Sequence, residues 1–345
     1  MKFVYDDSIS SYDFGPGHPF RGDRFPSFIR FLEERGEPFE LVGYVGEPPT
    51  IEDLKAVHDG EYLNFLRVRS QTGHGMVSLD TPAFKGMWEA ALSMVYSSMS
   101  AVRLALKERG AAGFGGAHHA GVNYGGGFCL LNDIAIATRW ALRNGIESAA
   151  IFDHDAHHGN GTMDIFYDDD TVLYVSIHQD PTTIYPGVGF ARQVGRGRGE
   201  GYTVNIPLPP GAGPSSYEMA FEELVRPIVE SFAPKLLIAH GGSDPHFLDP
   251  LTQLGLDLRG LWKLGRWASS LPADHRVELL ISGYNEHVRN WGWLGIVRGF
   301  ASLDMGFDPE EIEGRAPKED DYVIRRAKLS IDDAKSVLSK YWNLS

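Results

Sequence analysis

Four short apolar runs, each ending in polar or glycine-rich residues, constrain the fold of this chain more than any other feature of its sequence. The runs are Ala149–Phe152, Val172–Ile177, Leu236–Ala239 and Leu279–Ile281. Runs of this length are typical of strands that are buried on both faces of a parallel sheet. Stretches with helical spacing alternate with them. We therefore expect an α/β fold in three layers, with a mostly parallel sheet and helices on both faces.

Amphipathic stretches predict the helices of this fold. Apolar residues recur at helical spacing from Trp88 to Leu106 and stop before Gly110, and the same pattern covers Asn132–Arg143 before Gly145. No internal repeat and no linker divides the chain, so we expect a single domain over residues 1–345. Further helices are predicted near Tyr217–Phe232, Leu258–Ser270 and Trp291–Leu303.

Charge and composition exclude several classes of function. The chain has 32 Lys and Arg against 46 Asp and Glu, a net charge of −14, which repels nucleic-acid backbones. Cys129 is the only cysteine, which excludes an internal disulfide and thiolate-rich metal sites. Acidic residues replace the apolar stretch of a signal peptide, and no apolar run reaches the roughly 18 residues of a membrane span. We expect a soluble, cytoplasmic protein that binds neither membrane nor nucleic acid directly; the oligomeric state stays open.

Titratable residues follow the predicted strands at the point where each strand ends. Open α/β sheets bind ligands outside the carboxyl ends of their strands, so we expect a site that gathers these side chains. The residues concerned are Asp153, Asp155, His157 and His158 after the first strand, His178 after the second, His240, Asp244 and His246 after the third, and Gly283 with Tyr284 after the fourth.

The residues after the first strand have the spacing of metal ligands. Residues two apart in an extended chain point the same way, so Asp155 and His157 can bind one ion, with Asp153 preceding them on that face. Asp244 from another strand completes a set of two carboxylates and one imidazole. This set suits Zn²⁺ and tolerates Fe²⁺ or Co²⁺. The alternative, a capped and solvated turn, is disfavoured by the second cluster of His and Asp.

A pair of histidines, His118 and His119, lies in the glycine-rich segment from Gly115 to Gly121. Histidine titrates near neutral pH, so adjacent imidazoles suit a general base and a general acid. Taken alone, the pair is equally compatible with a structural or surface role.

The order of these motifs resembles the zinc-dependent histone deacetylase superfamily, which includes acetylpolyamine amidohydrolases and the acetoin-utilisation proteins of prokaryotes. The resemblance extends from Asp13 to about Leu303. It implies a deacetylase-like catalytic domain with a core of about residues 13–303 and a C-terminal helical extension of about 308–345. The motifs are His118-His119, the segment Asp153–Thr162, Tyr174–His178, Tyr185–Gly189 and Ser282–Asn285.

The resemblance implies a zinc ion held by Asp155, His157 and Asp244. When bound, Zn²⁺ lowers the pKa of its water and polarises the substrate carbonyl. In the related binuclear manganese ureohydrolases, arginase and agmatinase, the Asp-Ala-His motif is followed two residues on by another Asp, and a later strand carries Asp-x-Asp. The positions of these additional carboxylates correspond here to Gly159 and His246. One metal is therefore favoured over two.

The resemblance also implies the catalytic roles. His119 becomes the principal base and acid, with His118 beside it and oriented by Asp153. Tyr284 becomes the electrophile that hydrogen-bonds the amide carbonyl and stabilises the oxyanion; the alternative for it is a core tyrosine. Asn160 stands behind the second histidine, where many members place an Asp, and a neutral partner should lower the pKa of His119.

Two structural K⁺ sites are implied in the same way. The first uses Asp153, Asp155 and Ser176, with the backbone carbonyls of His157 and Ile177. The second uses the carbonyls of Phe166, Asp169 and Val172, together with Tyr202.

Substrate contacts follow from the resemblance as well. Phe128 and Tyr185 correspond to the aromatic pair that walls an acyl-lysine channel, with Gly127 beside them, and Asp80 corresponds to a rim carboxylate that accepts substrate N–H groups. In place of the usual Arg-Pro before the histidine pair the chain has Phe114-Gly115-Gly116-Ala117, which removes a charge and should loosen the loop.

The function expected from these residues is a zinc amidohydrolase that removes acetyl or related acyl groups from amines. Its substrate would be an acetyl-lysine protein or peptide, an acetylpolyamine or a small acetamide. Two alternatives are a binuclear manganese ureohydrolase and a non-catalytic protein that binds acyl-lysine. The second alternative would be expected to lack a ligand, a histidine or Tyr284, and all of these are present.

Overall fold

The computed structural model describes residues 1–344 and has an α/β fold. Eight strands make up a mostly parallel sheet, and a short antiparallel pair is separate from it. The chain divides into two compact units. Unit 1 contains Met1–Glu147, Asn160–Ile165 and His275–Ile281, and unit 2 contains Ser148–Gly159, Phe166–Asp274 and the residues from Ser282 onward.

The sheet strands of unit 1 are parallel and follow the order β2, β1, β5, β10. Aromatic side chains fill the layer beside them: the ring of Phe3 on β1 meets that of Phe114 on β5 edge to face, with centroids 5.0 Å apart. The bounds of the strands are β1 Lys2–Val4, β2 Glu40–Val42, β5 Gly110–Phe114 and β10 His275–Ser282, and the antiparallel pair is β3 Met76–Ser78 with β4 Thr81–Pro82.

Local capping defines several helices of unit 1. Asp59 accepts a hydrogen bond from the N–H of Tyr62 at the start of α3, and Asn132 accepts one from Ala135 at the start of α5. The bounds are η1 Asp7–Ser11, α1 Arg24–Glu34, α2 Ile51–Lys55, α3 Gly60–Thr72, α4 Met87–Glu108, α5 Asp133–Arg143 and α6 Asn160–Phe166, the last residue of α6 being in unit 2.

The four strands of unit 2 are also parallel, in the order β9, β6, β7, β8. Every residue of β6, β7 and β9 is buried, which explains why each strand begins with an apolar run and has its polar residues toward its carboxyl end. The bounds are β6 Ala149–Asp153, β7 Val172–Gln179, β8 Thr203–Leu208 and β9 Leu236–Gly242. The helices are η2 Gly197–Gly199, α7 Pro214–Ala220, the π-helical turn η3 Phe221–Val225, α8 Arg226–Phe232, α9 Leu258–Ser270, α10 Glu286–Phe300, α11 Pro309–Glu313 and α12 Asp321–Leu338.

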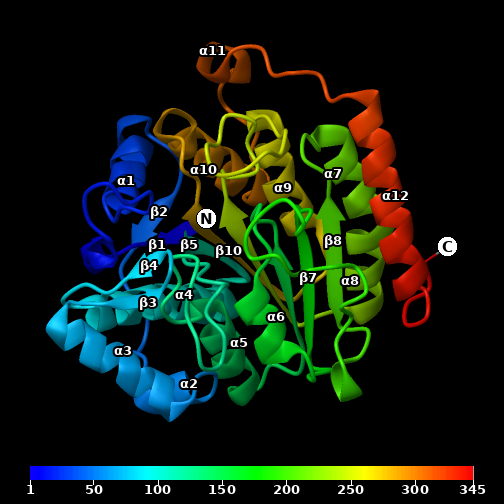
Figure 1. Cartoon of the computed structure of the whole chain (residues 1–345). Helices are drawn as coiled ribbons and strands as arrows, with labels where there is room; N and C mark the ends of the chain where they lie inside the picture. Colours follow the sequence, from blue (N-terminus) through cyan, green and yellow to red (C-terminus); the bar gives the residue numbers. More distant parts are fainter. Residues whose placement is uncertain (345) are drawn as a thin grey trace. The chain divides into compact units, whose positions relative to one another are not determined.

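The last helix covers one side of unit 2. Figure 1 shows α12, in red, running alongside β8 and α7, and the three elements are in contact. Its buried residues are spaced by three or four positions, which gives the helix a single apolar face. They are Ala327, Ile331, Ala334 and Leu338.

The predicted α/β fold with a mostly parallel sheet and flanking helices is confirmed. The four apolar runs are strands β6, β7, β9 and β10. Helix α10 begins at Glu286 rather than at Trp291, because Asn285 caps it by accepting from the N–H of His287. The prediction of a single domain stays a prediction. Among residues 1–344, no helix combines the length and the apolar character that crossing a membrane requires.

Candidate active site

Three side chains from two strand ends converge in unit 2. Asp155 and His157 follow β6, and Asp244 follows β9. The Nδ1 atom of His157 lies 3.1 Å from Oδ1 of Asp155 and 3.0 Å from Oδ2 of Asp244. One ligand atom from each residue lies within 4.8 Å of the others. The three predicted metal ligands are therefore brought together.

The charges of this cluster fit a divalent cation. Burial raises the pKa of Asp244 to about 7, with the nearby charge of Asp155 acting in the same direction. Burial alone would lower the pKa of His157, but hydrogen bonds to both carboxylates raise it to about 10. Buried carboxylates that perturb one another in this way are stabilised by a cation between them. Two carboxylates and one imidazole are also a donor set that Zn²⁺ accepts.

Neighbouring groups hold the ligands in place. The hydroxyl of Ser282, at the end of β10, donates to Oδ1 of Asp244 over 2.7 Å, and Thr252 donates to its backbone carbonyl over 2.6 Å. The N–H of His157 donates to Oδ1 of Asp155 over 2.8 Å. Hydrogen bonds of this kind orient metal ligands and are part of a metal site.

Asp153 is the last residue of β6, two positions before the predicted ligand Asp155, and is fully buried. Its Oδ1 accepts from the N–H of Asp155, and its Oδ2 accepts from the hydroxyl of Tyr174 over 2.8 Å. The Nε2 atom of His240 lies 3.5 Å from the same oxygen. Asp153 and Ser176 are register partners on β6 and β7, so two of the residues predicted for the first potassium site lie side by side on neighbouring strands.

Three of the residues predicted for the second potassium site, Phe166, Asp169 and Val172, lie between the end of α6 and the start of β7. The N–H of Asp169 donates to the carbonyl of Phe166 over 3.0 Å, and Val172 is the first residue of β7. The carbonyl of Tyr202 accepts from the N–H of Tyr174 over 2.9 Å. Phe166, Asp169 and Val172 therefore belong to one segment of unit 2. Tyr202, which precedes β8, lies outside that segment and is joined to β7 by its bond to Tyr174.

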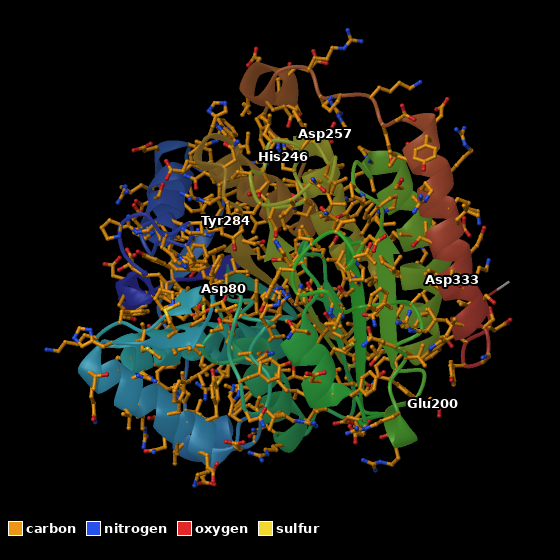
Figure 2. The ribbon with its side chains drawn as sticks, viewed as in Figure 1. Asp80, Glu200, His246, Asp257, Tyr284 and Asp333 are labelled. Atoms are coloured by element: carbon orange, nitrogen blue, oxygen red, sulfur yellow. The ribbon has the colours of Figure 1, made fainter. Side chains whose placement is uncertain are left out.

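Tyr284 follows β10 in unit 2 and is half-buried (Figure 2). Its backbone N–H donates to Oδ2 of Asp249 over 2.7 Å. Gly283 precedes it with φ +121°, and a β-carbon there would lie 2.0 Å from Oγ of Ser243. Only glycine fits both this backbone conformation and the space beside Ser243, so Gly283 helps to set the position of the Tyr284 backbone.

His118 and His119 lie in unit 1, after β5, and are 3% and 5% exposed. The Nδ1 atom of His119 lies 2.7 Å from Oδ1 of Asn160, the first residue of α6. The N–H of Thr162 donates to the carbonyl of His118 over 3.0 Å. The first turn of α6 thus holds the backbone of the histidine pair. The predicted pairing of His118 with Asp153 stays a prediction.

Hydrogen bonds to Asp133 hold the loop before the histidine pair. That the missing Arg-Pro loosens this loop stays a prediction. The carboxylate of Asp133 accepts from the N–H of Gly116 over 3.0 Å and from the N–H of Ala117 over 2.7 Å. The hydroxyl of Ser98 donates to the same carboxylate. Asp133 is fully buried, and burial raises its pKa. A buried carboxylate thus ties down this loop.

Two of the predicted substrate contacts bond to each other in unit 1. The carboxylate of Asp80 accepts from the N–H of Gly127, with distances of 3.1 and 3.2 Å to its two oxygens. The next N–H, that of Phe128, donates to the hydroxyl of Thr81 over 3.0 Å. Tyr185 belongs to unit 2, in the segment after β7, and is 44% exposed. Their contacts with substrate stay predictions.

A family model decides how this arrangement is classified. Residues 18–300 match the model of the histone deacetylase domain. The chain belongs to the histone deacetylase family. This membership confirms the resemblance on which the sequence predictions rest. It also supports their coarser part, a hydrolase that acts on amides.

Relatives of this histone deacetylase family member span most of its length. A "Probable deacetylase" from Archaeoglobus fulgidus is 37% identical over 98% of both chains. "Histone deacetylase 10, chloroplastic" from Oryza sativa subsp. japonica is 32% identical over 93% of this chain and 77% of the relative. "Acetoin utilization protein AcuC" from Staphylococcus aureus is 31% identical over 82% of this chain and 77% of the relative. A solved structure, "Crystal Structure of HDA15 HD domain", superposes with a TM-score of 0.86 at 25% identity and covers 99% of this chain and 97% of that one.

Sequence reasoning missed several residues of this histone deacetylase site. Asp249 holds the backbone of Tyr284, and Asp133 holds the loop before His118. Asp249 lies five residues after the predicted ligand Asp244 on the same segment, and this position was the sequence feature that could have indicated its role. Nothing local in the sequence connects Asp133 with the loop that it anchors.

Proposed function

We propose that this protein is a zinc-dependent amidohydrolase that removes acetyl or related acyl groups from amines. The observation that carries the proposal is the buried convergence of Asp155, His157 and Asp244 in unit 2 of a histone deacetylase family member. The same unit carries Tyr284 on the segment after β10, with its backbone fixed by Asp249.

The three converging residues would hold the metal. Bound there, Zn²⁺ would lower the pKa of a water molecule and polarise the carbonyl of the amide. Asp153 and Ser176, together with Asp155 and the carbonyls of His157 and Ile177, are the proposed donors for K⁺. The carbonyls of Phe166, Asp169 and Val172, with Tyr202, are the proposed donors for a second K⁺.

Four side chains would carry out or support the remaining steps of the reaction. The hydroxyl of Tyr284 would donate a hydrogen bond to the oxyanion that develops as water attacks the amide carbon. The Nε2 atom of His119 would take the proton from the water and return a proton to the leaving amine. His118 would assist from the neighbouring position. Asn160, which faces Nδ1 of His119, would orient that imidazole.

The proposed substrate is an acetylated amine: an acetyl-lysine protein or peptide, an acetylpolyamine or a small acetamide. Phe128 and Tyr185 would flank the acyl chain as aromatic walls. Asp80 and Gly127, already bonded to each other, would form part of the rim.

One observation favours a single metal over the binuclear site of a ureohydrolase. His246 takes the position where the binuclear enzymes have a carboxylate, and its Nε2 atom bonds to the buried carboxylate of Glu313. Gly159, the other such position, has no side chain. Neither residue adds a carboxylate for a second ion. The complete set of ligands, histidines and Tyr284 disfavours a non-catalytic reader.

The proposal is tested with zinc-loaded protein and a panel of acetyl-lysine peptides, acetylpolyamines and small acetamides. Asp244→Asn should lose both zinc binding and amine release, because three protein ligands are the usual set of a catalytic zinc site. Asp333→Asn is the matched control, since Asp333 is an exposed carboxylate on α12 (Figure 2). Equal activity of the two variants, or urea release from guanidino substrates, would reject the proposal.

A second variant tests the electrophile. Tyr284→Phe should retain zinc, and its kcat should fall by about 100- to 1,000-fold with a smaller change in KM, because the oxyanion forms only in the transition state. A hydroxamate, which binds through the metal, should still bind. Turnover within a few fold of the wild type would place the electrophile elsewhere.

A further inference from the structure

A chain of hydrogen bonds continues from His119 to the surface of unit 1. Oδ1 of Asn160 lies 2.7 Å from Nδ1 of His119, and Nδ2 of Asn160 donates to the hydroxyl of Tyr124 over 3.1 Å. The hydroxyl of Tyr124 in turn donates to Oδ2 of Asp164, which is exposed on α6. Neither Tyr124 nor Asp164 belongs to a motif that the sequence analysis identified.

The chemistry of Asp164 fixes the direction of the whole chain. A carboxylate only accepts, so the single hydrogen of the Tyr124 hydroxyl goes to Asp164. The oxygen of Tyr124 then accepts from Asn160, and the amide of Asn160 must turn its Nδ2 toward Tyr124. Its Oδ1 therefore faces His119.

The orientation of this amide determines the tautomer of His119. An amide oxygen only accepts, so the nitrogen opposite it must carry a hydrogen. In neutral His119 the hydrogen is then on Nδ1, and Nε2 keeps its lone pair. Nε2 is the atom that can act as a base.

We propose that Tyr124, held by Asp164, is a positioning residue that locks the amide of Asn160 and thereby keeps His119 in the tautomer with a basic Nε2. The inference rests on the proposed function, in which His119 takes a proton from water. With a phenylalanine at position 124, the amide of Asn160 could turn over and present Nδ2 to His119. The imidazole would then lose the partner that selects its tautomer.

The backbone is shaped to hold the ring of Tyr124 in this place. The N–H of Gly121 donates to the carbonyl of Tyr124 over 2.9 Å, which closes a tight turn. A β-carbon at Gly121 would lie 2.3 Å from Cε1 of Tyr124, so only glycine lets the ring fold back over this turn. The first turn of α6 packs closely against the residue before Gly121, because a β-carbon at Gly161 would lie 2.3 Å from the carbonyl oxygen of Ala120.

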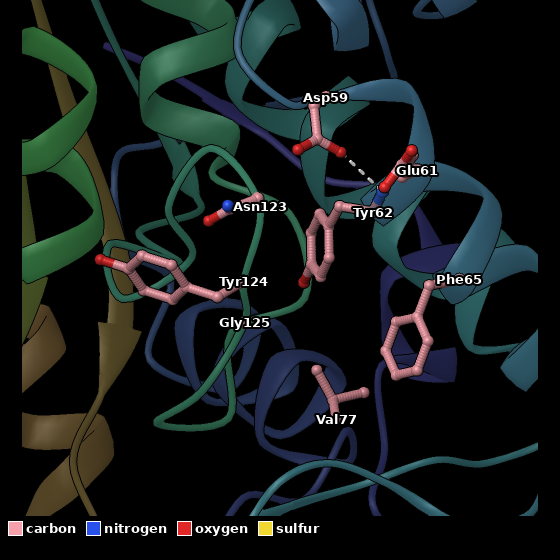
Figure 3. Close-up of a pocket in the computed structure, with 8 residues that line it drawn as sticks. All are labelled: Asp59, Glu61, Tyr62, Phe65, Val77, Asn123, Tyr124 and Gly125. Atoms are coloured by element: carbon pink, nitrogen blue, oxygen red, sulfur yellow. Dashed lines mark hydrogen bonds between the residues drawn. The ribbon is translucent and has the colours of Figure 1, made fainter.

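Tyr124 also forms one wall of a surface cavity of about 500 Å³ in unit 1. Figure 3 shows its hydroxyl pointing away from Tyr62 and Phe65, which line the same cavity. The ring therefore lines the cavity while the hydroxyl bonds to Asn160 and Asp164. The hydroxyl of Tyr62 donates to the carbonyl of Leu130 instead, over 2.7 Å, and takes no part in that chain.

The test is the tautomer of His119, read from two-bond ¹H–¹⁵N correlations of the full chain labelled with ¹⁵N-histidine. His119→Gln identifies the signal by its loss. In the wild type, Nδ1 should carry the hydrogen and Nε2 should not. Tyr124→Phe and Asp164→Asn should each convert this signal to a mixture of tautomers. On an acetylated lysine peptide, each should lower kcat by about tenfold with KM changed by less than about twofold.

Tyr62→Phe is the matched control, because it removes a hydroxyl from the same cavity without touching the chain to His119. It should keep the tautomer of the wild type. The proposal is overturned if the wild type carries the hydrogen on Nε2, or if Tyr124→Phe and Asp164→Asn both keep the wild-type tautomer and kcat. Absence of deacylation by the wild type would instead contradict the proposed function, and the spectra would still decide on the tautomer.

Discussion

The backbone N–H of Tyr284 donates to Oδ2 of Asp249 over 2.7 Å. The other carboxylate oxygen of Asp249 accepts from the N–H of Leu251 over 2.9 Å. Asp249 therefore connects the segment that follows the metal-ligand strand β9 to the segment that follows β10. Both segments belong to unit 2, so Asp249, together with the bond from Ser282 to Asp244, fixes the position of Tyr284 relative to that ligand.

The first prediction concerns turnover in Asp249→Asn. A neutral amide oxygen is a weaker acceptor than a carboxylate, so the segment that carries Tyr284 should be held less firmly. We expect kcat for an acetylated amine to fall by about tenfold while KM and hydroxamate affinity stay close to those of the wild type. Steady-state kinetics beside Asp333→Asn check this. An unchanged kcat would show that Tyr284 does not depend on Asp249.

The second prediction concerns the pH dependence of stability. Burial raises the pKa of Asp249 to about 6, against an ordinary value of 3.8. Between these values the folded chain binds a proton that the unfolded chain has lost. The contribution of Asp249 to stability is therefore present below about pH 4 and is lost as the pH rises through about 6.

Asp249→Asn removes this titration. The free energy of unfolding of the variant, relative to the wild type, should increase by up to about 3 kcal/mol as the pH rises from 4 to 7. Urea denaturation at several pH values measures the difference. A difference that is flat over this range would contradict the raised pKa of Asp249.

The third prediction concerns Gly283→Ala. Its positive φ and the close approach of Ser243 both oppose a side chain, so the free energy of unfolding should fall by at least about 1 to 3 kcal/mol, and kcat should fall with it. Gly36 has φ +62°, and a β-carbon there would have no atom within 4 Å, so Gly36→Ala measures the backbone cost alone. Equal losses of stability and unchanged kcat in both variants would argue against a role for Gly283 in placing Tyr284.

The fourth prediction concerns the C-terminal helices. The buried carboxylate of Glu313 on α11 bonds to His246 and accepts from the N–H of Leu258, which starts α9. His246 forms a β-bridge with Leu256, two residues before the start of α9. Glu313→Ala leaves both buried groups without this acceptor and should lower the free energy of unfolding by about 1 to 3 kcal/mol.

Glu310 is the control on the same helix. It is exposed, so Glu310→Ala should change the free energy of unfolding by less than about 0.5 kcal/mol. Thermal or urea denaturation compares the two variants. If both lose the same stability, the carboxylate of Glu313 has no specific role.

The sequence predicted the strands that are long and apolar and missed those that are not. Strand β5 consists of two glycines, two alanines and Phe114, without a β-branched residue. Strand β8 contains Asn205 and Pro207, which an outer strand tolerates because one of its edges is unpaired within unit 2. Strands β1 and β2 have three residues each, too few for a periodic pattern.

The residues of the candidate site likewise divide into those that a local sequence pattern predicts and those that it does not. Asp155 and His157 could be predicted because their spacing of two residues is a local pattern. The bond between Asp249 and Tyr284 joins residues 35 positions apart, and the bond between Tyr124 and Asp164 joins residues 40 positions apart. Such contacts are set by the packing of separate elements, which no short motif records.

A zinc titration of metal-free protein during hydrolysis of an acetylated amine tests the proposed zinc site most directly. Amine release should rise with added Zn²⁺ and saturate at a single ion per chain, and Asp244→Asn should stay inactive throughout. Amine release without any metal, or a requirement for two ions per chain, would contradict the proposed zinc site.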